Sequence, residues 1–96
     1  MKRDEVLAQL AACKSTLVSR YGVERLALFG STARDAASDA SDIDILVAFD
    51  GPATSERYFG VQFFLEDLLG RPVDLVTEKA LRVELRPFIE REALHV

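Results

Sequence analysis

One stretch of sequence decides the fold of this chain: Ser41-Asp42-Ile43-Asp44-Ile45-Leu46-Val47-Ala48-Phe49. Side chains alternate along a β-strand, so Asp42 and Asp44 share one face of a strand predicted over Asp42–Phe49. The other face is an apolar row that belongs on a hydrophobic core, made of Ile43, Ile45, Val47 and Phe49. After Asp44 the first face also turns apolar, so the two carboxylates lie at the beginning of an otherwise buried strand.

The paired carboxylates predict a cation site. Burying two anions without a counter-charge is costly and raises the pKa of one of them, and a divalent cation removes that cost. Carboxylate oxygens with room for water and phosphate favour Mg²⁺, or Mn²⁺. Zn²⁺ is not favoured, because one Cys and one His cannot form a zinc cluster.

The turn upstream of this strand predicts phosphate binding. The run Arg25–Phe29 is a predicted strand that ends at Gly30, and Ser31 is a favourable N-cap for a helix over residues 32–37. Glycine in such a turn lets backbone N–H groups approach an anion closely. Arg34 would then lie in the first helical turn, where the helix dipole disfavours a cation. It therefore either faces a bound phosphate or pairs with a nearby carboxylate.

A third acid follows on a second predicted strand, Val73–Val76. Its alternation buries Val73 and Leu75 and turns Asp74 to the other side, so Asp74 joins Asp42 and Asp44 if the two strands are neighbours. Three carboxylates in one cleft repel, unless two divalent cations bridge them to a triphosphate. The implied chemistry is phosphoryl or nucleotidyl transfer.

These elements together resemble the signature of the DNA polymerase beta-type nucleotidyltransferase superfamily, specifically its single-domain MNT (minimal nucleotidyltransferase) branch. The matching positions are Gly30-Ser31-x-Ala33-Arg34, Ser41-Asp42-x-Asp44 and the later Asp74. The resemblance implies the nucleotidyltransferase fold. It also implies that ATP is the substrate and that all three acids form an intact catalytic set.

The resemblance assigns a role to each matching position. Nucleotide binding is assigned to the turn and to the start of the strand, at Gly30, Ser31, Arg34 and Ser41. Catalysis and binding of two Mg²⁺ ions are assigned to Asp42, Asp44 and Asp74. Asp74 would in addition activate the acceptor hydroxyl.

The resemblance also implies a partner. Proteins similar to this one commonly act as the antitoxin of a HEPN ribonuclease toxin and transfer AMP from ATP to a toxin tyrosine. Two alternatives remain at this point. One is a nucleotidyltransferase for a small hydroxylated molecule such as an aminoglycoside, and the other is a stoichiometric antitoxin without catalysis.

Length and charge narrow the choice. The 96 residues predict one domain, 1–96, which is too small to enclose a nucleotide and so takes the second wall of its cleft from a partner or a second copy of itself. A net charge of −4 argues against a template-directed polymerase and against stable direct nucleic-acid binding. It suits a basic RNA-cleaving protein as partner.

The remaining segments alternate between helix and strand, which predicts an α/β or α+β domain with a small mixed sheet flanked by helices. The first twenty residues predict an amphipathic helix with an apolar stripe of Val6, Leu7, Leu10, Ala11, Leu17 and Val18. A second helix is expected over Ser55–Leu69, and it faces the sheet with Tyr58, Val61, Leu65, Leu68 and Leu69.

Phe59 and Phe63 form a second stripe on that helix. The ordinary expectation for large apolar residues is burial, here under the C-terminal segment, and the alternative is an exposed interface patch.

In the C-terminal segment, Thr77 is expected to cap a helix through Arg86, and Pro87 stops it or opens the next turn. Phe88, Ile89 and Leu94 are expected to return to the core. The charged residues between Glu78 and Glu92 predict a solvated helical face, from which Arg82 or Arg86 could reach the triphosphate.

The chain has one cysteine and one histidine. Cys13 is the only cysteine and is expected to pack in the core, which together with the absence of a signal peptide or an apolar membrane span predicts the cytoplasm. His95 is expected on the surface or at a partner contact.

Overall fold

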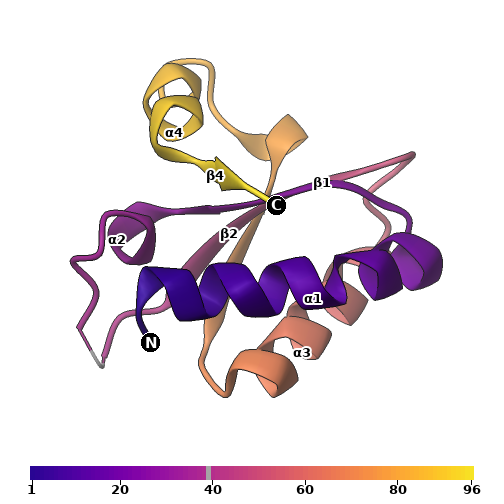
Figure 1. Cartoon of the computed structure of the whole chain (residues 1–96). Coiled ribbons are helices and arrows are strands. Elements are labelled where there is room, and N and C mark those ends of the chain that lie inside the picture. Colours follow the sequence, from indigo (N-terminus) through magenta and orange to yellow (C-terminus); the bar gives the residue numbers. More distant parts are fainter. Residues whose placement is uncertain (39) are drawn as a thin grey trace.

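The structure is a computed structural model that describes residues 1–38 and 40–96, arranged around a four-stranded mixed sheet (Figure 1). The strands are β1 (Val23–Phe29), β2 (Ile43–Phe49), β3 (Val73–Thr77) and β4 (Leu94–His95), in the spatial order β3-β2-β1-β4. The β2–β3 pair is parallel, and β1 runs antiparallel to both β2 and β4. The predicted α+β fold with a small mixed sheet is confirmed.

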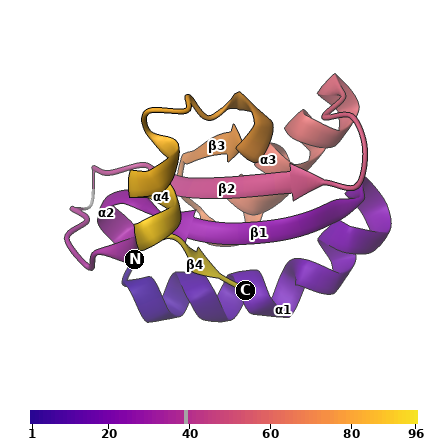
Figure 2. The same ribbon diagram turned by 90° about the horizontal axis from the view of Figure 1, so that it is seen from above.

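Helices lie on both sides of this sheet. The long helices α1 (Arg3–Tyr21) and α3 (Ser55–Leu69) cover one face, and the 3₁₀ helix η1 (Glu78–Ala80) and helix α4 (Arg86–Glu92) lie on the other (Figure 1). The short helix α2 (Gly30–Ala33) follows β1, and α4 lies beside it (Figure 2). None of the helices formed by the described residues is both long and apolar enough to cross a membrane.

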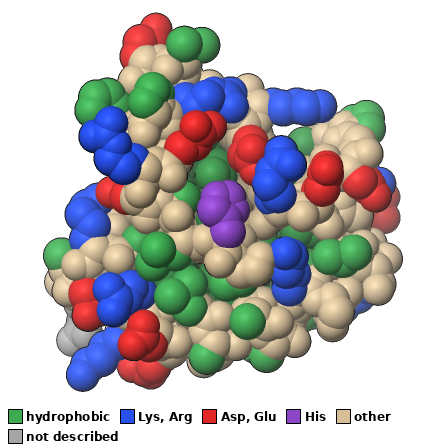
Figure 3. Space-filling model, turned by 45° about the horizontal axis from the view of Figure 1, so that its top comes forward, with side chains coloured by type: hydrophobic (Ala, Val, Ile, Leu, Met, Phe, Trp, Pro, Cys, Tyr) green, Lys and Arg blue, Asp and Glu red, His purple; other side chains and the backbone are tan. Residues whose placement is uncertain are grey.

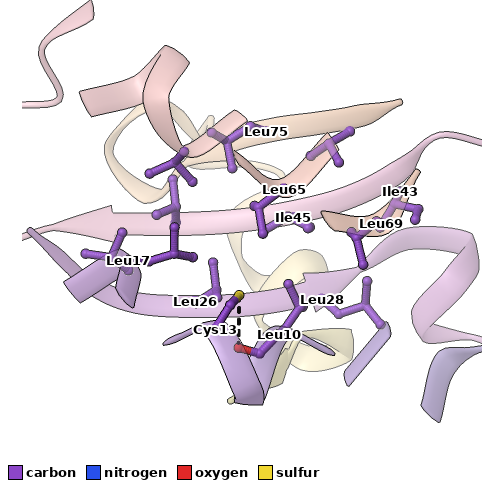
Figure 4. Close-up of a cluster of buried hydrophobic side chains, with 14 of the residues drawn as sticks. Leu10, Cys13, Leu17, Leu26, Leu28, Ile43, Ile45, Leu65, Leu69 and Leu75 are labelled. Carbon is purple, nitrogen blue, oxygen red and sulfur yellow. Dashed lines mark hydrogen bonds between the residues drawn. The ribbon is translucent and has the colours of Figure 1, made fainter. Parts of the chain in front are cut away.

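The hydrophobic core lies between the sheet and the two long helices (Figure 4). The apolar row of β2 is buried as predicted, and it comprises Ile43, Ile45, Val47 and Phe49. Leu46 on the opposite face of β2 is buried as well.

Helix α1 buries a narrower stripe than the sequence predicts. Leu10 and Leu17 are fully buried, and Cys13 lies between them with its thiol directed to the Leu10 carbonyl oxygen at 3.5 Å. The expectation that Cys13 packs in the core is confirmed. Ala11 and Val18 are exposed, so assigning them to the buried stripe was wrong.

Helix α3 begins and ends at the predicted residues. The Thr54 side chain caps its start by accepting the Arg57 N–H at 3.2 Å, and Gly70 ends it with a left-handed backbone. The predicted sheet-facing residues Val61, Leu65 and Leu69 are buried and Tyr58 packs against the core. Leu68 is 40% exposed, contrary to the prediction.

Phe59 and Phe63 are 49% and 60% exposed, and their rings stack on each other with centroids 6.1 Å apart. Their expected burial under the C-terminal segment was therefore wrong. That segment crosses the opposite face of the sheet from α3, so it cannot cover them (Figure 1).

The C-terminal segment contains two short helices instead of one longer helix. Thr77 caps a helix as predicted, but η1 ends after three residues because Leu81 has an extended backbone. Pro87 is the second residue of α4 and so opens a new helix. Ile89 is half-buried, but Phe88 is 65% exposed, and its predicted return to the core was wrong.

Strand β4 was not predicted. It pairs Leu94 with Leu28 and His95 with Ala27, and the Val96 N–H continues the contact to the Leu26 carbonyl oxygen at 3.0 Å. Leu94 packs against the core as predicted, and His95 is exposed.

Candidate active site

The sheet places two of the predicted acids side by side. In the parallel β2–β3 pair Asp44 lies opposite Asp74, and in the antiparallel β1–β2 pair Asp44 lies opposite Phe29, the last residue before the Gly30 turn. The condition set by the sequence, that the two acidic strands be neighbours, is met. One end of the sheet therefore brings together the turn after β1 and the carboxylates of β2 and β3.

Asp44 is the electrostatic centre of this group. Its side chain is half-buried, and its pKa is raised to about 6, first by burial, then by the charge of Asp74 and a hydrogen bond to it, and then by the charge of Asp42. Arg34 acts in the opposite direction. The site thus holds more negative charge than it can stabilise by itself, and one carboxyl group retains a proton into the weakly acidic range.

The three acids do not form a closed metal cage. Among residues 1–38 and 40–96 no group of three or more His, Cys, Asp or Glu side chains is arranged to hold a metal ion. Asp42 and Asp74 are exposed, so their rotamers can change without disturbing the core. The donor set nevertheless fits a divalent cation, because hard oxygen ligands whose repulsion raises a carboxyl pKa are stabilised by such a charge.

Gly30 is required by both backbone geometry and space. Its φ of +74° lies in the left-handed region, and a Cβ added there would overlap the Asp44 carboxylate. The backbone of the turn therefore lies directly against the central acid of the site, at a distance that no residue with a side chain allows.

The N–H of Gly30 already has an acceptor. It donates to Glu92 Oε1 at 3.0 Å, and Arg34 Nη1 donates to Glu92 Oε2 at 2.8 Å. Arg34 was expected either to face a bound phosphate or to pair with a carboxylate, and the structure shows its ion pair with Glu92. Sequence reasoning missed Glu92, because nothing in the spacing of α4 indicates a contact 62 residues away.

The two serines have structural contacts near the site. Ser31 does not cap α2, because Phe29 is the N-cap residue and no side chain caps this helix. The Ser31 carbonyl oxygen accepts the Ala36 N–H at 2.9 Å. The predicted helix over residues 32–37 was also wrong, since α2 ends at Ala33. Ser41 Oγ accepts the Ser38 N–H at 3.1 Å. Nucleotide binding by Ser31 and Ser41 stays a prediction.

A cavity of about 400 Å³ lies at the other end of the same sheet face. Its lining includes Ala48, which shares a strand face with Asp44, and the ion pair of Arg25 with Glu78 at 2.8 Å. Arg86 also lines it and donates to the Glu78 carbonyl oxygen at 3.1 Å. Arg86 therefore faces the open side of the sheet.

The comparisons with known proteins agree with this arrangement. The model of the nucleotidyltransferase domain family matches residues 10–95. The protein adenylyltransferase MntA of Thermococcus cleftensis is 36% identical over 93 residues, which cover 97% of this chain and 94% of the relative.

Solved structures show the same fold. A structure named only as a candidate minimal nucleotidyltransferase is 39% identical, covers 98% of this chain and 95% of its own, and superposes with a TM-score of 0.84. A complex of a tri-AMPylated Shewanella oneidensis HEPN toxin with its MNT antitoxin contains a chain with a TM-score of 0.60. That match is 18% identical over 97% of this chain and 66% of the other, and it supports the fold alone.

The family uses a nucleotide substrate and a divalent metal, which is the chemistry that the turn and the paired acids of this chain indicate. With the matched domain, the close relative and the shared fold, the chain belongs to the nucleotidyltransferase domain family and is a transferase of that class.

Proposed function

We propose that this chain is a protein adenylyltransferase that acts as an antitoxin, transferring AMP from ATP to a tyrosine hydroxyl of a HEPN ribonuclease toxin. The observation that carries the proposal is the Asp44–Asp74 pair beside the Gly30 turn, where burial and then charge repulsion raise the pKa of Asp44 to about 6. Such a pair is typical of a site that needs positive charge from its ligands.

In this proposal the triphosphate lies against the turn formed by Gly30 and Ser31, with Arg34 and Ser41 beside it. Asp42, Asp44 and Asp74 would hold Mg²⁺, which would supply positive charge for the phosphate oxygens. The acceptor oxygen forms a bond to the α-phosphorus while the bond to pyrophosphate breaks, and the hydroxyl proton passes to Asp74. Asp74 suits this role because its side chain is exposed and an acceptor can reach it.

Exposed apolar side chains near the site support a protein as the acceptor of AMP. The segment before α4 and the helix itself expose three apolar side chains on the same side of the sheet as the site, Val83 at 79%, Leu85 at 50% and Phe88 at 65%. Figure 3 shows hydrophobic side chains on the lobe that α4 forms, next to a face on which acidic and basic groups are mixed. We infer that the toxin covers this lobe and supplies the second wall of the cleft. The ATP that the reaction needs agrees with the predicted cytoplasmic location.

The test is the intact mass of a HEPN-family partner protein after incubation with this chain, Mg²⁺ and ATP. A gain of one or more AMP units is expected with the wild type and none with Asp42→Asn/Asp44→Asn. Asp67→Asn is the matched control, since Asp67 is an exposed acid on α3, on the other side of the sheet, and should leave transfer intact.

The two alternatives give different outcomes. A stable complex that forms without any AMP gain, and that neutralises the toxin equally well with the double mutant, would identify a stoichiometric antitoxin. AMP transfer to an aminoglycoside but not to the protein would identify a small-molecule transferase.

A further inference from the structure

The feature that the proposed function leaves unexplained is Glu92. Its two carboxylate oxygens bind two different donors of the candidate phosphate site, the Gly30 N–H at 3.0 Å and the Arg34 guanidinium at 2.8 Å. A carboxylate that bridges a backbone N–H and a guanidinium makes the same charge-assisted hydrogen bonds that a phosphate oxygen makes. Glu92 thus occupies the groups that a triphosphate would need.

We propose that Glu92 is an internal competitor of the nucleotide, so that the triphosphate binds only when its phosphate oxygens displace the Glu92 carboxylate from Gly30 and Arg34. This inference rests on the proposed function, because it assumes that these two groups bind the triphosphate. It adds a residue from the C-terminal helix that sets nucleotide affinity.

The Gly30 turn needs a hydrogen-bond acceptor when no nucleotide is bound. The Gly30 N–H is partly buried, and a buried N–H without an acceptor is costly. Without nucleotide the turn therefore requires an acceptor, and Glu92 provides one with a side chain that is only 28% exposed. When a phosphate oxygen becomes available, the same N–H can exchange one anion for the other.

The helix that carries Glu92 is fixed, so displacement involves the side chain. α4 is followed directly by β4, which pairs with β1 at Ala27 and Leu28. The Lys14 Nζ also donates to the Val96 carbonyl oxygen at 2.6 Å. A glutamate can rotate about its own bonds while these contacts stay in place. Because the Arg34 side chain is 56% exposed, water can solvate both partners during the exchange.

The experiment measures the Kd of MgATP and of inorganic triphosphate by calorimetry for the wild type and Glu92→Gln. Glutamine can still accept the Gly30 N–H but loses the charge that binds Arg34. The variant should therefore bind both ligands about 2- to 10-fold more tightly. Adenosine, which has no phosphate, should bind both proteins equally.

Two further variants separate this contact from other effects. Glu84→Gln removes a negative charge from an exposed side chain just before the same helix and controls for long-range electrostatics, so its Kd should change less than that of Glu92→Gln. Glu92→Asp keeps the charge but is one methylene shorter, so it should also tighten binding. It keeps the test valid if the glutamine variant unfolds.

Equal or weaker triphosphate binding by both Glu92 variants would overturn the inference and show that Glu92 only supports the turn. In that case the wild type still binds MgATP and the proposed function stands. If neither the wild type nor any variant binds MgATP or triphosphate, the proposed function fails together with the inference.

Discussion

The two faces of the sheet are built on different principles. The face under α1 and α3 is a continuous apolar core, with Leu10, Leu26 and Leu65 fully excluded from solvent. The face under α4 carries half-buried and exposed charges from β1, β2, β3 and the C-terminal helix. The first face stabilises the chain, and the second holds charges whose repulsion reduces stability. Removing an apolar side chain from the first face should therefore lower stability, whereas removing an acid from the second face should raise stability and weaken ligand binding.

The largest effect is expected on the packed face. Leu65→Ala removes a fully buried side chain of α3 and should lower the free energy of unfolding by about 2–5 kcal/mol, measured by urea denaturation. Leu68→Ala is the matched control, because it makes the same chemical change on the same helix at a side chain that is 40% exposed. It should cost less than about 1 kcal/mol. Equal losses would contradict the contrast in packing.

An intermediate effect is expected at the turn, where Gly30→Ala and Gly70→Ala form a matched pair. Both glycines have a positive φ, +74° and +66°, so alanine is strained at either position. A Cβ at Gly70 meets open space, and the cost there should be about 1–2 kcal/mol. At Gly30 the overlap with the Asp44 carboxylate should add about 1 kcal/mol, because that carboxylate can rotate away from the new Cβ.

The two glycine variants should also differ in nucleotide binding. Gly30→Ala should abolish MgATP binding measured by calorimetry, whereas Gly70→Ala should retain it. Loss of binding in both variants would indicate a general disturbance of the fold and not a contact with the site.

The smallest effect is the pH dependence of stability from Asp44. Its pKa is raised from 3.8 to about 6, so the folded state holds a proton that the unfolded state has released between these values. The free energy of unfolding of the metal-free protein should therefore fall as pH rises from about 4 to 6. Above pH 6 the full penalty is present, and below pH 4 it is absent.

Asp44→Asn should remove this fall and be more stable than the wild type at pH 7, as measured by thermal or urea denaturation. Asp67→Asn should keep the wild-type profile. If Asp44→Asn showed the same pH dependence of unfolding as the wild type, repulsion between the acids would not affect stability.

Periodicity predicted most of the packed face but also assigned Ala11, Val18 and Leu68 to it, which are exposed. The bounds of α3 and the buried row of β2 follow from apolar residues at regular spacing, and each is found as expected. The predicted burial of Phe59 and Phe63 was wrong, because their exposure depends on which face of the sheet the C-terminal segment crosses. No local sequence pattern carries that information.

The geometry of the candidate site could be predicted at the Gly30 turn and at the acids that lie on strands. The alternation of β2 and β3 placed Asp44 and Asp74 correctly once the strands proved to be neighbours. β4 has only two residues, too few to show a sequence period. The contact of Glu92 with the turn depends on where β4 places α4, so it could not be predicted either. α2 ends early, at Ala33, and two residues later the chain turns away at Asp35, whose φ of 59° is uncommon for a residue with a side chain.

The buried thiol in α1 gives the packed face an intrinsic chemical probe. Cys13 is the only cysteine of the chain, and burial raises the pKa of its thiol, so the folded protein presents little reactive thiolate. A thiol reagent can modify it only when α1 separates from the sheet. The rate of alkylation therefore reports how often the core opens, and comparing that rate with and without MgATP would show whether a ligand on one face of the sheet stabilises the other.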